Sequence, residues 1–331
     1  MKAAYFEKTG EPEVIQYGEL PTPGLASAEV LVKVGAVSVN PIDTYIRAGM
    51  VAMQLPIPYI IGCDLAGTVE KAGPGCRRFK PGDRVWGSNQ GLLGRQGTFA
   101  EYAAVREDLI YATPANVKDT DAAAAALVGI TAHIGLFRCA KLQPGETVFV
   151  NGGTGGVGSM VVQMAKAVGV RVITTVGSAE KAATCRGWGA DLVLNYKTDD
   201  VAEGIKKFTG GEGVDVWYET QREPDFLKAV PLIRRRGRMV IMAGRQAQPI
   251  FPVGPFYTKD LSLFGFAMFL ATPEEQRACA SDINRWLAEG KLRVPIGRTF
   301  KLAEAAGAHR LQEDNTLQKA GTLMGKIVLV P

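Results

Sequence analysis

The chain has 331 residues, enough for two domains that each bury a core. Its formal net charge is only +5, and its hydrophobic content of 47 % is ordinary for a globular protein. No run approaches the ~18 uninterrupted apolar residues of a membrane span, and the N-terminus lacks the apolar core of a signal peptide. We therefore expect a cytoplasmic protein with no membrane partner. Its five cysteines form no CxxC pair, which favours free thiols in a reducing compartment.

Residues 1–125 predict a compact, mostly antiparallel β unit. Short β-like runs such as "EVLVKVGAVSV", "DRVWG" and "TFAEYAAV" alternate with turns rich in Gly and Pro, such as "LPTPG" and "FKPGD".

Residues 126–265 alternate between strands and helices, which predicts right-handed βαβ units and a parallel sheet, hence an α/β fold. The expected strands are "TVFVN", "RVITTV", "DLVLNY", "VDVWYE", "RMVIMAG" and "LSLFGF". The basic run "IRRRGR" at 233–238 is expected to solvate a helix end, because no recognition motif accompanies it. A nucleic-acid partner is thus not favoured.

Residues 266–331 no longer show the alternation of strands and helices. Thr272, Pro273 and Glu275 combine a capping residue, a proline at the first helical position and an acid three residues after the cap, which predicts a helix start. A final strand is expected at "GKIVLV".

The segment between "TVFVN" and the next helix carries the clearest functional signal. Residues 153–158 fit GxGxxG, and Gly152, Gly155 and Gly158 also fit GxxGxxG. After a strand and at the start of a helix, such a turn lets a pyrophosphate approach bare backbone and meet the helix N-terminus. We therefore expect a dinucleotide at Gly155, Gly156, Val157 and Gly158.

The end of the next strand indicates which dinucleotide. A strand that serves NAD usually ends in an acid that accepts the ribose hydroxyls, but this one ends in Val176, Gly177 and Ser178. Lys181 follows where an ammonium can meet a 2′-phosphate, and Glu180 is expected to face solvent. The pattern favours NADPH over NADH.

With these features the chain resembles the medium-chain dehydrogenase/reductase superfamily, and within it the zinc-free quinone oxidoreductases of the zeta-crystallin group. The resemblance spans nearly the whole chain, through "NPIDTYIRAG", "GCDLAGTVEKAG", "GTFAEY", "GITAHIGL", the glycine turn and "LVLNY". It implies a GroES-like, β-rich catalytic domain from residues 1–125, a Rossmann domain with a doubly wound parallel sheet at 126–265, and a C-terminal return to the catalytic domain at 266–331.

The resemblance also implies that no metal is bound. Where zinc alcohol dehydrogenases of the superfamily place ligands, this chain has Asn40, Cys63 and Asp64. The segment "GSNQGLLGRQGTFAEY" has no four-cysteine lobe. The two histidines, His133 and His309, leave little else to hold a metal, so Cys63 is interpreted as a small core residue.

In this family hydride passes directly to a quinone or another conjugated carbonyl beside hydrogen-bond donors. Matched residue by residue, Asn40 and Tyr45 are the expected donors, with Asp43 and Arg47 supporting their geometry. The alternative makes Tyr45 a half-buried loop aromatic. The residues that the resemblance places at the cofactor, besides the glycine turn, Gly177, Ser178 and Lys181, are Asn40, Thr131, Tyr196, Gly244, Arg245, Gly265, Phe266 and Ala267.

Two departures leave the substrate open. Gln221 and Arg222 replace a usual small-residue turn and are expected to intrude there, and the segment 254–270 is unusually aromatic. The alternatives to a quinone are an activated C=C bond in an enal, enone or enoyl thioester, or no chemistry at all in a nucleotide-binding or RNA-binding relative. The family expectation for assembly is a homodimer through an edge strand at 261–266.

Overall fold

The computed structural model describes all 331 residues and divides into two compact units. The first unit comprises Met1–Leu127, Ala271–Gly290 and Val294–Pro331, and the second comprises Val128–Leu270 and Lys291–Arg293. The C-terminal segment thus belongs mainly to the same unit as the N-terminal segment.

The first unit is built on a seven-stranded sheet in the order β15-β16-β3-β5-β6-β8, with β7 also paired to β3. Every pairing is antiparallel except that of β15 with β16, which confirms a mostly antiparallel β unit. A small sheet in the order β2-β1-β4 accompanies it. The strands are β1 (Lys2–Phe6), β2 (Gln16–Glu19), β3 (Glu29–Val39), β4 (Tyr59–Ile60), β5 (Asp64–Ala72), β6 (Arg84–Gly87), β7 (Tyr102–Arg106), β8 (Ile110–Ala112), β15 (Ile296–Lys301) and β16 (Lys326–Val330).

The helices of this unit include one that was predicted and two that were not. The helix α8 (Pro273–Ala288) begins at the expected place, where the Thr272 hydroxyl accepts from the Glu275 N–H at 3.2 Å and the Glu275 carboxylate accepts from the Thr272 N–H at 2.8 Å. The helices α1 (Pro41–Arg47) and α9 (Ala305–Thr316) lack a long apolar repeat, but they pack against each other. Three short 3₁₀ turns complete the unit, η1 (Pro12–Val14), η2 (Glu107–Leu109) and η5 (Leu302–Glu304).

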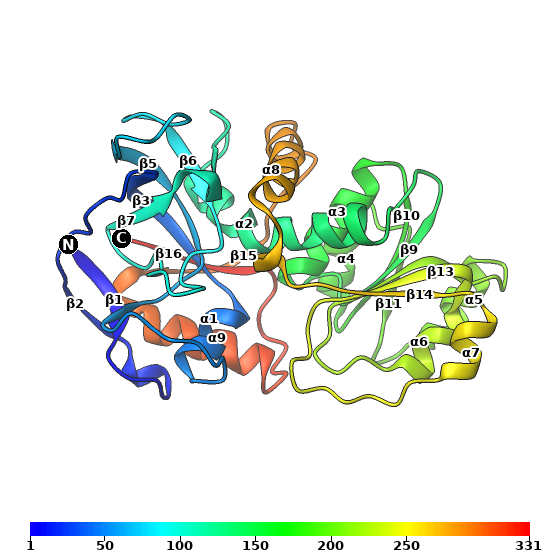
Figure 1. Ribbon diagram of the computed structural model, residues 1–331. Helices are drawn as coiled ribbons and strands as arrows, with labels where there is room; N and C mark the ends of the chain where they lie inside the picture. Colours follow the sequence, from blue (N-terminus) through cyan, green and yellow to red (C-terminus); the bar gives the residue numbers. More distant parts are fainter. The chain divides into compact units, whose positions relative to one another are not determined.

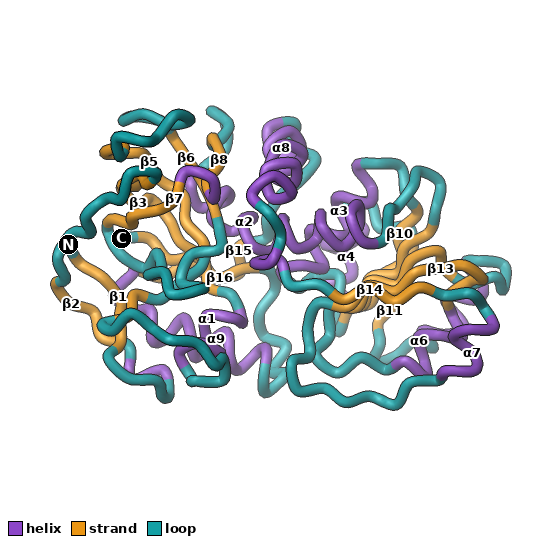
Figure 2. Tube along the Cα trace, in the orientation of Figure 1, coloured by secondary structure: helices purple, strands orange, loops and turns teal.

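The second unit is a parallel six-stranded sheet in the order β11-β10-β9-β12-β13-β14, as the alternating pattern predicted. Its helices cover both faces, with α3 and α4 on one and α6 and α7 on the other (Figure 1), and the strands run side by side between them (Figure 2). The strands are β9 (Thr147–Asn151), β10 (Arg171–Val176), β11 (Leu192–Asn195), β12 (Val214–Glu219), β13 (Ile233–Ile241) and β14 (Ser262–Gly265). The helical elements are α3 (Gly156–Ala167), α4 (Ala179–Gly187), α5 (Val201–Phe208), α6 (Phe226–Leu232), α7 (Val253–Thr258) and η4 (Met268–Leu270).

This strand order has one reversal, between β9 and β12. Successive strands are added outward in one direction from β9 through β10 to β11, and in the other from β12 to β14. Ligands of such open sheets bind outside the carboxyl ends of the strands at the reversal. The glycine turn follows the carboxyl end of β9 directly, so the topology places it at this position.

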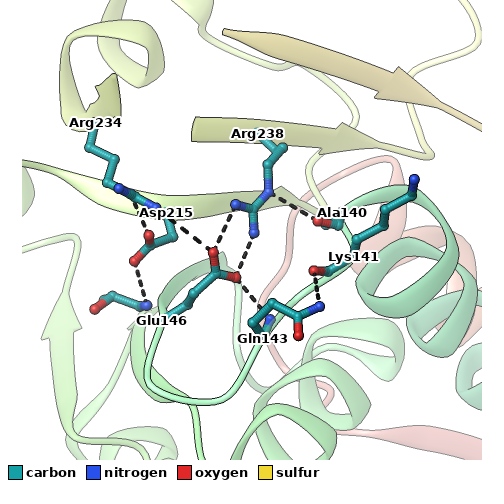
Figure 3. A network of polar contacts seen from close by, with 8 residues as sticks. Ala140, Lys141, Gln143, Glu146, Asp215, Arg234 and Arg238 are labelled. Atoms are coloured by element: carbon teal, nitrogen blue, oxygen red, sulfur yellow. Dashed lines mark hydrogen bonds and ion pairs between the residues drawn. The ribbon is translucent and has the colours of Figure 1, made fainter. Parts of the chain in front are cut away.

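The basic run at 233–238 differs from its expected role. It starts β13 directly after α6, and Arg238 donates to both oxygens of Glu146, at 2.9 and 2.6 Å, and to the Ala140 carbonyl at 3.0 Å (Figure 3). Arg234 pairs with Asp215, whose carboxylate also accepts from the Thr147 N–H at 2.7 Å. The expectation that this run only solvates a helix end is wrong, because two of its arginines tie the amino ends of β9, β12 and β13 together.

The helix α2 (Asp119–His133) continues through a π-helical turn, Ile134–Cys139, and gives one helical segment of 21 residues, whose most apolar window of 18 residues has a mean hydropathy of 1.5. Its length and composition match those of a membrane span. However, 83 % of its most apolar window is buried inside the protein, as is typical of a core helix.

Candidate cofactor and catalytic sites

The glycine turn holds glycines for two different reasons. A Cβ at Gly158 would lie 2.0 Å from the Gly152 carbonyl oxygen, and one at Gly153 would lie 2.2 Å from Thr174 Oγ1, so the protein's own packing excludes side chains there. At Gly155 the nearest atom to such a Cβ is the Gly152 oxygen at 3.6 Å, so nothing in the chain requires glycine. Its bare backbone instead leaves room for a group from outside the chain.

The open side of this turn is the N-terminus of α3. Gly155 is the exposed N-cap, and Gly156 and Val157 are half-buried residues of the first turn, whereas Gly158 is buried. The first N–H groups of a helix have no partner within it, and the helix dipole adds positive potential. The residues present therefore fit the pyrophosphate of a dinucleotide.

Four predicted residues lie together at the carboxyl end of β10. Ser178 caps α4 and accepts from the Lys181 N–H at 3.3 Å. A Cβ at Gly177 would lie 2.4 Å from the Tyr196 hydroxyl, so Tyr196, itself 59 % exposed, lies over that glycine. The strand ends at Val176 with no carboxylate, and Glu180 is exposed as expected.

The other predicted cofactor residues of this unit lie after β13 and β14 or on α2. Gly244 has φ of +91°, and a Cβ there would lie 2.4 Å from the Arg222 carbonyl oxygen. Thr131 is buried in α2, where its carbonyl accepts from the Tyr218 hydroxyl of β12 at 3.0 Å. The remaining four follow the carboxyl ends of two adjacent strands, with Arg245 exposed after β13, Gly265 exposed as the last residue of β14, and Phe266 and Ala267 half-buried beyond it.

Gln221 and Arg222, predicted to intrude after β12, each lie beside a glycine of the predicted cofactor site. A Cβ at Gly152 would lie 2.6 Å from Gln221 Nε2, so the Gln221 side chain occupies space beside the first glycine of the turn. The Arg222 backbone takes the corresponding place beside Gly244.

Asn40 and Tyr45 belong to the first unit, where Asn40 caps α1 and Tyr45 lies half-buried within that helix. Tyr45 is therefore half-buried, as the alternative expected, but it lies in a helix and not in a loop. Its role as a donor stays a prediction. Asn40 is fully buried: its Nδ2 donates to Asp64 Oδ2 at 2.8 Å, and Lys326 Nζ donates to its Oδ1 at 2.5 Å. Both ends of the Asn40 amide therefore have partners within the first unit, and its contact with substrate or cofactor stays a prediction.

The cluster around Asn40 is a buried set of ionisable groups. Lys326 from β16 also donates to the Val39 carbonyl at 2.6 Å, and Asp64 accepts a second hydrogen bond from Ser38 at 2.8 Å. Burial raises the pKa of Asp64 and lowers that of Lys326, while the opposite charge of each works against these shifts. Sequence reasoning missed Lys326, because a lysine in a five-residue terminal strand carries no local sign of burial.

Asp43 supports this arrangement from the first turn of α1. Its Oδ2 accepts from the Asn40 N–H at 2.7 Å. Burial raises the pKa of Asp43 to about 7, opposed by a hydrogen bond with Cys63. Cys63 is fully buried, as its interpretation as a core residue requires, and burial raises the pKa of its thiol.

Arg47 fixes the other end of α1. Its side chain is 1 % exposed, donates to the Gly10 carbonyl and pairs with Glu313 of α9. Asp43 and Arg47 therefore hold the two ends of the helix that carries Tyr45.

The two histidines lie in different surroundings. His133 packs against Phe137 with ring centroids 4.6 Å apart, and His309 is buried in α9. No group of three or more His, Cys, Asp or Glu side chains in the chain is arranged to hold a metal ion.

Comparisons with known proteins agree with this architecture. Residues 26–115 match the alcohol dehydrogenase GroES-like domain, and residues 156–284 match the family described as zinc-binding dehydrogenase. A GroES-like domain joined to a Rossmann domain with an open glycine turn defines a medium-chain dehydrogenase/reductase.

Individual relatives narrow this class. The chain is 31 % identical to a quinone oxidoreductase of Homo sapiens, over 100 % of this chain and 98 % of that protein. The crystal structure of Escherichia coli quinone oxidoreductase complexed with NADPH matches with a TM-score of 0.87 at 29 % identity, over 100 % of both chains. That of 2-haloacrylate reductase matches with a TM-score of 0.84 at 29 % identity, over 100 % of this chain and 99 % of that one. The chain belongs to the zeta-crystallin-like quinone oxidoreductases of the medium-chain dehydrogenase/reductase superfamily.

Proposed function

We propose that the protein is an NADPH-dependent, zinc-independent reductase that transfers hydride to a quinone. The observation that carries this proposal is the pair of neighbouring features at the carboxyl ends of β9 and β10. One is a glycine turn open to an outside anion, and the other is a strand end with a hydroxyl, an ammonium and no carboxylate. The NADPH complex of the Escherichia coli relative supports the choice of cofactor.

The residues of the second unit account for cofactor binding. The N–H groups at Gly156 and Val157 hold the pyrophosphate, because they begin a helix and have no intrahelical partner. Gly155, whose N–H donates to the Gly152 carbonyl at 3.3 Å, lets the phosphates approach its bare backbone. The Ser178 oxygen accepts from the Lys181 N–H, which leaves its hydroxyl hydrogen for a 2′-phosphate, and the Lys181 ammonium supplies the opposite charge. Thr131, Tyr196, Gly244, Arg245, Gly265, Phe266 and Ala267 line the rest of the cofactor.

Tyr45 is the hydrogen-bond donor to the substrate in this proposal. When bound, NADPH supplies the hydride. The Tyr45 hydroxyl donates a hydrogen bond to the acceptor oxygen and stabilises the negative charge that develops there. Asn40 acts through α1, whose first turn it holds with Asp64 and Lys326. No metal takes part.

The second candidate reaction is the reduction of an activated C=C bond in an enal, enone or enoyl thioester. The likeness to 2-haloacrylate reductase favours it, because that name describes the reduction of an acid whose C=C bond is conjugated with its carboxyl group. The same donor would then serve the carbonyl or carboxyl oxygen of the conjugated system.

A panel of acceptors tests the reaction. We expect NADPH oxidation, followed at 340 nm, to be fastest with quinones. Faster oxidation with enones, enals or 2-haloacrylates would move the assignment to the second candidate. No oxidation with any acceptor, while NADPH still binds, would support a nucleotide-binding or RNA-binding role without catalysis.

A titration of both cofactors tests the site at β10. A charge-assisted hydrogen bond contributes about 1.5–3 kcal/mol, so Lys181→Ala should weaken NADPH binding by roughly 10- to 100-fold and leave NADH binding nearly unchanged. Glu180→Ala, one residue away and exposed, is the matched control. Equal affinity of the wild type for NADH and NADPH would contradict the assignment of the 2′-phosphate site.

The proposed enzyme works in the cytoplasm as a homodimer with no nucleic-acid partner. Support for the dimer comes from β14, an edge strand of the six-stranded sheet with one side unpaired. Sedimentation of the wild type against a Leu263→Pro variant in β14 tests this. A wild type that sediments as a monomer would refute it.

A further inference from the structure

A chain of partly buried hydrogen bonds leads from the first glycine of the turn to Glu219. The Gly152 N–H donates to Thr175 Oγ1 at 3.0 Å, and that hydroxyl donates to Asn151 Oδ1 at 2.9 Å. Asn151 Nδ2 in turn donates to both carboxylate oxygens of Glu219, at 3.0 and 3.1 Å. The bonds link the carboxyl ends of three neighbouring strands, β10, β9 and β12.

Glu219, at the far end of this chain, is a buried acid held by neutral donors. Its residue is 2 % exposed, and besides Asn151 it accepts from Trp217 Nε1 at 3.1 Å and from the Gln221 N–H at 2.8 Å. Burying a carboxylate is costly unless its oxygens are satisfied by donors. These donors satisfy the oxygens of Glu219. They also fix the orientation of the Asn151 side chain, because only one orientation lets its NH₂ donate to Glu219 while its oxygen accepts from Thr175.

The backbone of Asn151 is held by the same loop. Its carbonyl oxygen accepts from the Thr220 hydroxyl and, at 3.5 Å, from Gln221 Nε2. Strand pairing alone does not need these side chains, because β9 and β12 already pair in register from Val216↔Val148 to Glu219↔Asn151. Apolar residues would satisfy that packing without any charge to bury.

The group of the glycine turn to which this chain of side chains connects is the N–H of Gly152. Gly152 has φ of +91° and begins the turn that leads to the open backbone at Gly155. Because the Gly152 N–H is bound by Thr175 Oγ1, the direction in which the chain leaves β9 is fixed. The N–H groups at the start of α3 are thereby fixed before any anion arrives, and such preorganisation raises affinity.

We propose that Glu219, Asn151 and Thr175 are positioning residues for the dinucleotide: Glu219 orients the Asn151 amide, and Thr175 transmits that orientation to the glycine turn. The inference rests on the proposed function, since it takes the turn as the cofactor site. The residues act through the turn and do not contact the cofactor.

The sharpest test changes hydrogen-bond polarity at nearly constant shape. Glu219→Gln puts an NH₂ where the Asn151 NH₂, the Trp217 N–H and the Gln221 N–H all need an acceptor. We expect the Kd for NADPH, measured by quenching of protein fluorescence, to rise about 10-fold. The kcat at saturating NADPH should stay within about 2-fold, because the reacting groups are elsewhere.

A reciprocal exchange separates positioning from a general defect. In the double variant Glu219→Gln with Asn151→Asp, the amide introduced at position 219 donates to the carboxylate introduced at position 151, which still accepts from Thr175. We expect this variant to recover part of the lost affinity, because one of the Trp217 and Gln221 N–H groups still faces the introduced NH₂, whereas Asn151→Asp alone, with two carboxylates in contact, should recover none. Glu212→Gln, the same chemical change at an exposed position of the second unit, is the matched control.

The outcomes are distinct. Wild-type affinity in Glu219→Gln, or failure of the double variant to recover any of the lost affinity, overturns the positioning role. Failure of the wild type to bind NADPH overturns the proposed function instead. If Glu219→Gln does not fold, Thr175→Val, which leaves the Gly152 N–H without its acceptor, is compared with Thr175→Ser, which keeps the hydroxyl. Equal Kd values in that pair would also refute the proposal.

Discussion

His309 should make the protein sensitive to acid. Its side chain is fully buried in α9, edge-on to Phe99 at 6.0 Å between ring centroids, and neither ring nitrogen has a hydrogen-bond partner. Burial, helped by the nearby positive charge of Arg47, lowers the pKa of His309 to about 3. An imidazolium has nothing in this site to stabilise it.

The magnitude follows from linkage. The unfolded chain titrates His309 near its ordinary pKa of about 6.5, and the folded chain near 3, so as the pH falls only the unfolded state takes up the proton. The stability contributed by neutral His309 is therefore complete above pH ~6.5 and is lost as the pH falls toward 3. At pH 5 the loss is about 2 kcal/mol, or about 3 °C in Tm for a chain of this length.

The assay compares the wild type with His309→Leu, in which no titrating group remains. We expect the Tm difference between the two, read at pH 7.5, 6 and 5, to change by about 3 °C in favour of the variant as the pH falls. The Tm difference at pH 7.5 itself also reflects altered packing in the variant, so the test uses only the change of this difference with pH. A Tm difference that stays constant from pH 7.5 to pH 5 would refute the reasoning.

The wild type alone would not reveal this effect, because Asp43 titrates with the opposite sign. The folded pKa of Asp43, about 7, is raised above its unfolded value, so the folded state favours the protonated acid. Its cost to stability grows as the pH rises from about 4 to 7, by an amount of about 2 kcal/mol over the tested range. Asp43→Asn keeps an oxygen for the Asn40 N–H and should expose the full acid sensitivity of His309.

Three further outcomes are expected. Tyr45→Phe should lower turnover by ~10²–10³ with little change in NADPH affinity, and an unchanged rate with every acceptor would remove Tyr45 from the mechanism. Activity should be complete in EDTA, whereas stoichiometric zinc found by elemental analysis of active protein would contradict metal independence. Gly177→Ala should weaken NADPH binding, because its Cβ would lie 2.4 Å from the Tyr196 hydroxyl, and Tyr196→Phe in the same chain should relieve part of that loss. Equal affinities for NADPH in the single and double variants would show that Tyr196 does not cause the loss.

The second unit was predictable because each of its signals is local. The strands of the parallel sheet are short and mainly apolar, except for the basic first half of β13, and the glycine turn lies between an apolar strand and an amphipathic helix. The residues at the end of β10 are also close in sequence, which is why their grouping was foreseen apart from the contact of Tyr196 with Gly177.

The first unit was predictable only in outline. The helix α1 has seven residues, too few for a periodic pattern, although Asn40, Pro41 and Asp43 form a helix start of the same kind as the one that revealed α8. Arg47 and Glu313 pair across 266 positions of sequence, and Lys326 reaches Asn40 across 286. No local pattern encodes contacts of that range.

These long-range contacts give Asn40 partners within the chain that its place in the sequence does not reveal. The role of a donor to substrate comes to Asn40 from the resemblance to the family, which carries no information on the partners of Asn40 in this chain. In the structure the final strand pairs with β3 and brings Lys326 beneath α1, where its ammonium needs an acceptor and a carboxylate nearby. The Asn40 amide meets both needs at once, because its oxygen accepts from Lys326 while its NH₂ donates to Asp64. The first turn of the helix that carries Tyr45 is thus tied to the last five-residue strand of the chain, and this link is the basis of the proposal that Asn40 acts by holding that helix in place.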